Sequence, residues 1–287
     1  MDNKRVGIKE VVYTPESRIR HPSILFKEMF RDLISSHELA WRLFLRDISS
    51  KYRQSLLGFL WVFLPPIFTA GIFIMLQRQA ILNVKDTAIP YPAFALVGTV
   101  LWQTFVDSIN APLRAVTASK PIIAKIKIPY EALILSAIGE VLFNLSMKII
   151  IILLVFLFFK LPLTTGLILA PFAISVLILH GIFIGLLLTP IGLLYKDVQN
   201  GLVIATNLWF FLTPVIYPTP TSFPLSLIAK LNPVSPLIIV ARDLITRGII
   251  SDITLFAGVT LFTLFGLLFV WILYRISIPI VIERMSA

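Results

Sequence analysis

The chain has 287 residues, of which 57% are hydrophobic and only 14% are charged, and its mean hydropathy is +0.92. One soluble core cannot bury so much apolar surface, so the composition excludes an ordinary soluble protein and indicates an integral membrane protein. The chain has no cysteine, which excludes disulfides, thiolate metal sites and cysteine nucleophiles. The net charge of +10 would suit nucleic acid, but on so apolar a chain it more often reflects membrane topology and anionic lipid.

Residues 1–55 carry charge throughout and are expected to form a cytoplasmic N-terminal region with amphipathic helices. Apolar residues recur at helical spacing over residues 25–34, and charged residues take the other face, which is typical of a helix lying in the membrane interface. Ser35 and Glu38 match a capping box, which predicts the start of a second helix. This region contains no apolar segment typical of a signal peptide, so we expect the N-terminus to stay in the cytoplasm.

The remainder of the chain predicts six transmembrane helices, because about 20 apolar residues are needed to cross the hydrocarbon core of a bilayer. The expected spans are residues 56–77, 92–111, 131–159, 166–194, 200–217 and 254–275. We therefore expect an all-α integral membrane protein with a six-helix domain over residues 56–275 and a cytoplasmic tail over residues 276–287. The proline-rich segment between spans five and six predicts short re-entrant helices, with a packed outer cap as the alternative.

The distribution of basic residues tests this topology. Eighteen of the 25 Lys and Arg residues fall on the side of the N-terminus, six fall on the opposite side, and Lys148 lies within a span. Cytoplasmic loops carry such an excess of Lys and Arg, so both termini are expected in the cytoplasm. The same bias explains the positive net charge without nucleic acid.

Pro65 and Pro66 lie near the middle of the first predicted span. Each lacks a backbone donor and clashes with the preceding turn, so a kink or a break is expected. A membrane tolerates a break only where protein or a water-lined path covers the freed carbonyls. The span is therefore expected to face a partner or a pore, and a simple packing kink is the alternative.

The segment over residues 112–130 interleaves isoleucines with lysines between spans two and three. Apolar side chains with basic flanks suit docking into a groove of a cytosolic partner, although an ordinary positive-inside loop has a similar composition. Asp107, near the end of span two, is expected to reach the cytoplasmic interface.

Span three carries three polar residues at helical spacing, Glu140, Asn144 and Lys148, which places them on one face. Ionisable residues within a membrane are costly and point to function. This face is expected either to lie at a dimer interface or to line a transport path. A proton-coupled carrier would also need such a carboxylate, but the spans contain no evident inverted repeat or matched pair of broken helices.

Five segments then resemble, in order, the permease subunit of ABC-type polysaccharide exporters, the family that handles O-antigen, capsular polysaccharide and teichoic acid. They are KYRQSLLGFLWVFLPP at 51–66, IIAKIKIPYEAL at 122–133, LLYKDVQN at 193–200, TPVIYP at 213–218 and NPVSPLIIVARDLI at 232–245. Each is weak by itself, but together they cover roughly residues 35–275.

The resemblance implies a homodimer in the bacterial cytoplasmic (inner) membrane, bound to two copies of a separate cytosolic ATPase. Residues 24–34 and about 120–131 would contact that ATPase. The residues expected to couple the two subunits are Phe26, Met29, Phe30, Ile123, Lys125, Ile126, Lys127 and Glu131. No Gly-Lys pair occurs in the chain, so it has no P-loop. ATP and Mg are therefore expected in the partner, with no cofactor or metal and no catalytic residue in this chain.

The substrate implied by the resemblance is a polysaccharide on a polyprenyl diphosphate, with O-antigen favoured over capsule or teichoic acid. Lys51 and Arg53 are expected to attract the lipid diphosphate at the mouth of the path, with topology signalling as the alternative. Aromatic side chains offer platforms on which sugars can slide, and they are equally common in membrane interfaces and cores. The candidates are Trp61, Phe68, Trp102, Phe105, Trp209, Phe210 and Tyr217.

Two other classes of apolar protein are alternatives to the exporter subunit. An ion-coupled secondary transporter would place Glu140 in its mechanism. A membrane glycosyltransferase or lipid phosphatase would need metal ligands or a nucleotide-sugar site. The three histidines are scattered, however, and the cytoplasmic loops are small. The sequence therefore favours a transport subunit over an enzyme.

Overall fold

The computed structural model of the chain describes residues 22–286 except residues 54, 83, 85, 86, 124 and 127. The described residues form helices and connecting turns, and they contain no β-strand. Residues 1–21 of the expected N-terminal region and Lys127 of the expected partner segment lie outside the described residues.

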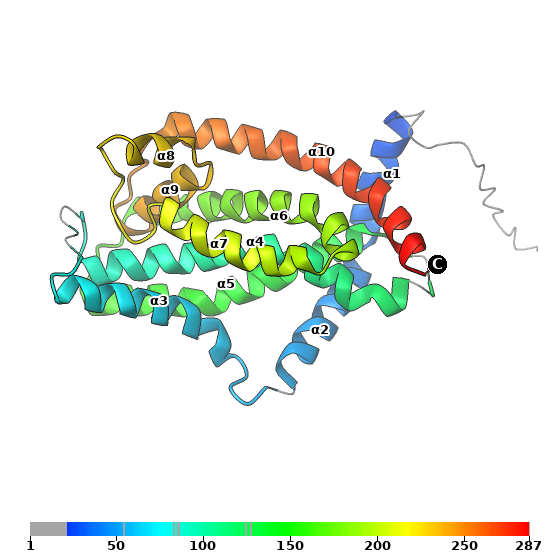
Figure 1. The fold of residues 1–287 in the computed structure, drawn as a ribbon, viewed down its shortest axis with the longest axis horizontal. Helices are drawn as coiled ribbons and strands as arrows, with labels where there is room; N and C mark the ends of the chain where they lie inside the picture. The colour runs from blue at the N-terminus through cyan, green and yellow to red at the C-terminus, as the bar shows by residue number, and fades with distance from the viewer. Residues whose placement is uncertain are drawn as a thin grey trace, which may run out of the picture.

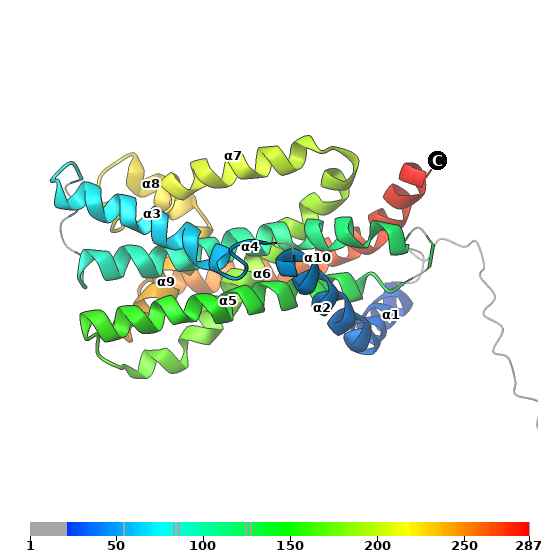
Figure 2. The same cartoon turned by 90° about the horizontal axis from the view of Figure 1, so that it is seen from below.

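The long helices run side by side in one elongated bundle (Figure 1). The α-helices in chain order are α1 Pro22–Ser35, α2 His37–Arg53, α3 Leu60–Arg78, α4 Tyr91–Ile123, α5 Glu131–Phe159, α6 Ala170–Leu194, α7 Asp197–Leu212, α8 Leu225–Leu231, α9 Val234–Thr246 and α10 Ile253–Ser286. A short 3₁₀ helix, η2 Thr165–Ile168, precedes α6. Helices α1 and α2 lie at one end of the bundle with the C-terminus, whereas α8 and α9 lie toward the other end (Figure 2). We call these the α1–α2 end and the α9 end.

The chain passes along the bundle six times, through α3, α4, α5, α6, α7 and α10. Five of these helices are long and apolar enough to cross a membrane; α7 is the exception, with 16 residues. At 1.5 Å per residue α7 is only about 24 Å long, so the fifth predicted span is a shorter helix than expected. The predicted all-α membrane protein is confirmed, with short helices α8 and α9 between the last two passes, bent by 86° relative to each other.

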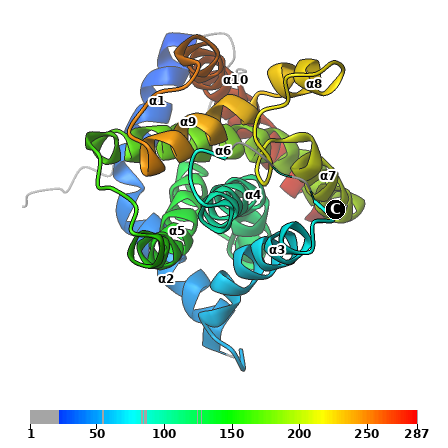
Figure 3. The same cartoon turned by 90° about the vertical axis from the view of Figure 1, so that its left-hand side faces the viewer.

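Helix α4 lies in the middle of the bundle and is surrounded by the other long helices (Figure 3). Glycines of α6 allow the closest contact with it. A Cβ at Gly181 would lie 2.5 Å from the Ser108 Cβ, and a Cβ at Gly185 would lie 2.4 Å from the Ile109 carbonyl oxygen. Small residues four positions apart let two membrane helices approach closely. The sequence of α6 therefore fixes its position against α4.

Two helices are longer than expected. The second span was expected to end at residue 111, but α4 continues through Pro112 to Ile123. Its last turns therefore occupy most of the segment that was expected to be a loop. Likewise, α10 continues past residue 275 to Ser286, so residues 276–286 extend the last helix.

The predicted pair of N-terminal helices is confirmed, but the capping box between them is wrong. The Ser35 hydroxyl donates to the Asp32 carbonyl oxygen at 3.3 Å, and the Glu38 carboxylate pairs with Arg42 at 2.7 Å. Ser36 sits at the junction, and its hydroxyl also donates to the Asp32 carbonyl. The serines thus close the end of α1 and leave the start of α2 uncapped by Ser35.

Candidate functional site

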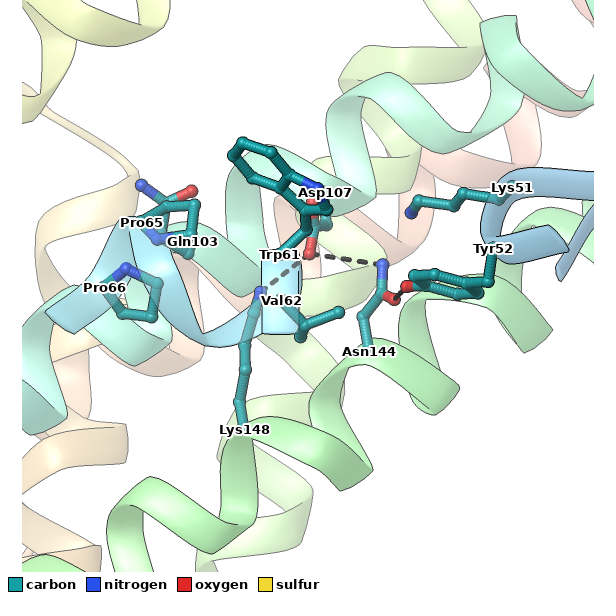
Figure 4. Close-up of a pocket in the computed structure, with 10 residues that line it drawn as sticks. All are labelled: Lys51, Tyr52, Trp61, Val62, Pro65, Pro66, Gln103, Asp107, Asn144 and Lys148. Carbon is teal, nitrogen blue, oxygen red and sulfur yellow. Dashed lines mark hydrogen bonds and ion pairs between the residues drawn. The ribbon is translucent and has the colours of Figure 1, made fainter. Parts of the chain in front are cut away.

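A polar cavity lies where α2, α3, α4 and α5 meet (Figure 4). Its volume is about 90 Å³, which is room for a few water molecules and far too small for a sugar chain. The residues that line it are Lys51, Tyr52, Trp61, Val62, Pro65, Pro66, Gln103, Asp107, Asn144 and Lys148. Within an apolar bundle, this is a concentrated set of charged and hydrogen-bonding groups.

The centre of the site is an ion pair between two long helices. The Lys148 Nζ of α5 lies 2.7 Å from the Asp107 Oδ2 of α4, and the Lys148 side chain is only 3% exposed. The Asn144 amide donates to the same carboxylate oxygen at a longer distance of 3.5 Å. Charge-assisted hydrogen bonds of this kind are short, and they hold the register of the two helices. Asp107 was expected to reach the cytoplasmic interface; it pairs with Lys148 while its side chain is 26% exposed, and its depth in the membrane stays a prediction.

Glu140, one helical turn away from Asn144, binds two cations from other helices. Lys51 of α2 lies 3.0 Å from the Glu140 Oε1, and the Arg114 Nη2 of α4 lies 3.3 Å from the same oxygen. Two positive charges thus share one carboxylate, which leaves this part of the site with a net positive charge. The carboxylate also fastens the end of α2 to the membrane bundle.

Tyr52, next to Lys51 in the chain, connects the group around Glu140 with the group around Asp107. Its hydroxyl donates to the Asn144 Oδ1 at 3.5 Å, and its ring lies tilted against those of Phe59 and Phe143, with centroids 4.4 and 6.4 Å away. Burial raises the pKa of the Tyr52 hydroxyl; the Glu140 carboxylate raises it further, while Lys51 lowers it. The hydroxyl therefore remains a neutral donor over the physiological pH range.

The three polar residues of span three lie on one face, as predicted, and all three are buried. That face is turned toward α2 and α4 of the same chain, where Glu140, Asn144 and Lys148 find their partners. Their burial is therefore satisfied without a dimer interface.

The two prolines of span one do not break the helix. Helix α3 runs continuously from Leu60 through Pro65 and Pro66. Because a proline at position i cannot donate to the carbonyl at i−4, the carbonyls of Trp61 and Val62 lose their helical donors. Both residues line the polar cavity. A kink or a break was expected at the prolines; the helix is not broken, and cover of the freed carbonyls by protein or water stays a prediction.

The expected substrate-path aromatics fall into two groups. Four of them form one interior cluster, with Trp102 5.5 Å from Phe105 and 5.7 Å from Phe210 between ring centroids, and with Trp209 5.5 Å from Phe105. The second group is Trp61 and Phe68 of α3, which are exposed, and Trp61 also borders the polar cavity. Tyr217 belongs to neither group, and its hydroxyl donates to the Phe211 carbonyl at 2.8 Å. The four clustered rings pack against one another and belong to or border the hydrophobic core.

The expected ATPase-coupling residues also divide by exposure. Phe26, Phe30, Lys125 and Ile126 are exposed at the α1–α2 end. Met29 and Ile123 are buried, and Glu131 is buried in an ion pair with Arg275. In this structure those three side chains face the bundle and do not present a surface to a partner.

Arg275 was missed by the sequence analysis, although it ties three helices together. Its guanidinium, on α10, bonds to Glu131 of α5 and lies 2.7 Å from the Asp32 Oδ2 of α1. The signal was present, since Arg275 follows a long apolar run, but a residue at a span end is normally explained by topology. The same holds for Arg114. The described residues contain no group of three or more His, Asp or Glu side chains that could hold a metal ion.

Comparison with known proteins shows the family to which the chain is similar. The ABC-2 type transporter family matches residues 38–246. An O-antigen export system permease of Myxococcus xanthus is 27% identical over 212 residues, covering 71% of this chain and 79% of the relative. A Klebsiella pneumoniae protein of the same description is 26% identical and covers 77% and 86%.

A polysialic acid transport protein of Escherichia coli is 25% identical, with 81% of this chain and 91% of the relative covered. The matched residues, 38–246, include nearly all of α2, the charged site and every helix from α3 to α9. A multi-pass bundle of apolar helices is the architecture expected of a permease. The chain belongs to the ABC-2 type transporter family.

Proposed function

We propose that the chain is the channel-forming permease subunit of an ATP-driven exporter that moves a lipid-linked polysaccharide, with O-antigen favoured, across the bacterial cytoplasmic membrane. The observation that carries this proposal is the family match over residues 38–246. The relatives described above, named for O-antigen export and polysialic acid transport, support a polysaccharide cargo. Two copies of the chain would assemble with two copies of a cytosolic P-loop ATPase, with both termini in the cytoplasm.

The exposed surface at the α1–α2 end supports an ATPase partner there. The Phe26, Phe30 and Ile126 side chains are 36%, 49% and 62% exposed. Exposed large apolar side chains, with the exposed Lys125 next to Ile126 in the chain, suit a groove on a soluble protein. The docking surface of the proposal therefore consists of these four residues, and it omits the buried Met29, Ile123 and Glu131.

The cations at the end of α2 support attraction of a lipid diphosphate. Lys51 and Arg114 share one carboxylate, so one positive charge is left over at Glu140. Arg53, the last residue of α2, is exposed to solvent and adds another. A diphosphate at the membrane surface would meet a net positive mouth, where cations attract anionic head groups.

An ion-coupled carrier is the second candidate, and the structure weighs against it. A carrier that moves protons on Glu140 needs that carboxylate to exchange protons with water. Glu140 is held by both Lys51 at 3.0 Å and Arg114 at 3.3 Å, and its side chain is only 11% exposed. The carboxylate is better suited to joining helices than to carrying protons.

The assembly is tested by purifying the tagged full-length chain from its own cell in mild detergent and weighing the complex by native mass spectrometry. We expect two copies of the chain with two ATPase chains. A lone monomer or dimer that still transports its substrate under an ion gradient would overturn the proposal and favour the carrier.

The role of the α2 cations is tested with the double variant Lys51→Gln/Arg53→Gln. We expect the lipid-linked polymer to accumulate inside the cell while assembly with the ATPase remains intact. The matched control is Lys230→Gln, which removes an exposed lysine of α8, outside the docking surface and the charged site, and should leave export unchanged. Normal export by the double variant would show that these cations only set topology.

A further inference from the structure

A second polar cavity lies at the α9 end, away from the site described above. Its volume is about 230 Å³, below the range of roughly 300 Å³ upward that is usual for drug-sized ligands. The residues that line it come from the connections before α4, after α7 and after α9, and from α4 and α9 themselves. They are Thr87, Ala88, Ile89, Phe94, Pro218, Thr219, Ile239, Arg242, Asp243, Thr246, Arg247 and Ser251.

Arg242 is the distinctive residue of this cavity. It is only 3% exposed, and its guanidinium lies 3.7 Å from the centroid of the Phe94 ring. Its Nη1 donates to the carbonyls of Pro214 at 3.1 Å and Val215 at 3.0 Å. Its Nε, also buried, has no hydrogen-bond partner among the described residues. A buried guanidinium normally pairs with a carboxylate, but none of the described carboxylates lies within ion-pair distance of Arg242.

The other polar groups of the cavity define the ligand that would complete it. Arg247 adds a second positive charge, and Asp243, which accepts a hydrogen bond from Ser251, adds one negative charge. The described lining thus carries one net positive charge, together with the hydroxyls of Thr87 and Thr219. A ligand with one negative charge and several hydroxyls would satisfy both the charge and the hydrogen-bonding groups.

We propose that the cavity at the α9 end binds one carboxylate-bearing sugar unit, with its carboxylate toward Arg242 and Arg247 and its hydroxyls toward Asp243 and the threonines. The volume admits a single sugar ring and excludes a chain segment. The α9 end lies opposite the proposed cytoplasmic docking surface, so the cavity would receive a sugar after it has passed along the bundle. This inference rests on the proposed function for the nature of the cargo.

The test uses the absence of native cysteine, which lets one introduced thiol report on the cavity. Thr219→Cys places that thiol in the exposed lining. The full-length variant, in lipid nanodiscs, is labelled with a polar maleimide in the presence of glucuronate, glucose, acetate or inorganic phosphate. We expect glucuronate to slow labelling in a saturable way, and to do so at lower concentrations than the other three.

Charge variants in the same background identify the residues responsible. Arg247→Gln should weaken glucuronate protection by about tenfold, the effect of losing one charge-assisted hydrogen bond. Arg242→Gln should abolish protection by glucuronate. Arg242→Lys keeps the positive charge and serves as the control for a folding defect. Arg78→Gln is the matched control, because Arg78 is exposed at the same end but does not line the cavity.

Four results would overturn the proposal. They are no protection by glucuronate, equal protection by glucose, equal protection by acetate or phosphate, and unchanged protection in Arg247→Gln and Arg242→Gln together. The assay needs neither the ATPase nor transport. A permease that assembles and exports but fails this assay would refute only the sugar site, whereas glucuronate binding by a chain that recruits no ATPase would refute only the exporter.

Discussion

Replacing Lys148 by methionine tests whether the ion pair between α4 and α5 holds the bundle together. The substitution keeps a long apolar stem but removes the ammonium that lies 2.7 Å from the Asp107 carboxylate. Removing one partner of a buried pair typically costs about 3–5 kcal/mol, because the other charge is left uncompensated. The Asp107 side chain is 26% exposed and borders a cavity that can hold water, so we expect the lower end of that range, about 3 kcal/mol.

The assay is the free energy of unfolding of the purified chain, measured by titration with a denaturing detergent. Asp107→Leu/Lys148→Met removes both charges and should recover most of the loss, since apolar replacement of a whole buried pair is often close to neutral. Lys230→Met, at an exposed lysine of α8, should change stability by less than about 0.5 kcal/mol. The reasoning fails if Lys148→Met behaves like this control, or if the double variant is no more stable than the single one.

Three further changes probe other contacts. Arg275→Ala removes the bonds to Glu131 and Asp32, so α1 should be cut faster in limited proteolysis. Arg275→Lys should restore part of the protection. Equal rates of cutting in the unchanged protein and both variants would contradict the role of Arg275 in holding α1. Gly185→Ala drives a Cβ to within 2.4 Å of the Ile109 carbonyl oxygen and should cost about 1–3 kcal/mol of unfolding free energy. Gly201→Ala, which meets open space, should be neutral or slightly stabilising, and the argument fails if the two glycine variants match. Thr99→Val removes a buried hydroxyl that lies within 3.2 Å of the carbonyls of Ala95, Leu96 and Pro66, and it should cost about 1 kcal/mol in the same titration, where no change would show that this hydroxyl makes no stabilising bond.

Helical periodicity alone predicted that Glu140, Asn144 and Lys148 share a face, because spacing within one helix fixes direction. It did not predict their partners. Asp107 and Arg114 lie on another helix, and Lys51 lies on a third, so pairing them requires the relative register of three helices. That register depends on side-chain packing, which no local pattern encodes.

Helix α4 runs further than the apolar pattern predicts. The second span was expected to end at residue 111, and the next residue is Pro112, a residue type that is unfavourable within a helix. In the structure Pro112 packs closely against α6, where a Cβ at Gly185 would lie 2.9 Å from the Pro112 Cγ. This contact accompanies an uninterrupted α4 that runs on to Ile123. A tertiary contact of this kind overrides a local rule and cannot be seen in a sequence window.

Helices α4 and α10 contain 33 and 34 residues, so each is about 50 Å long, well beyond the roughly 30 Å of a hydrocarbon core. Either helix would therefore extend beyond the hydrocarbon core. Prolines lie inside both helices, Pro112 and Pro121 in α4 and Pro279 in α10, but α10 contains none between Ile253 and Arg275. Arg275 joins α10 to α1, the helix that carries the exposed Phe26 and Phe30. An unbroken stretch of helix therefore connects this ion pair with the α9 end of the bundle.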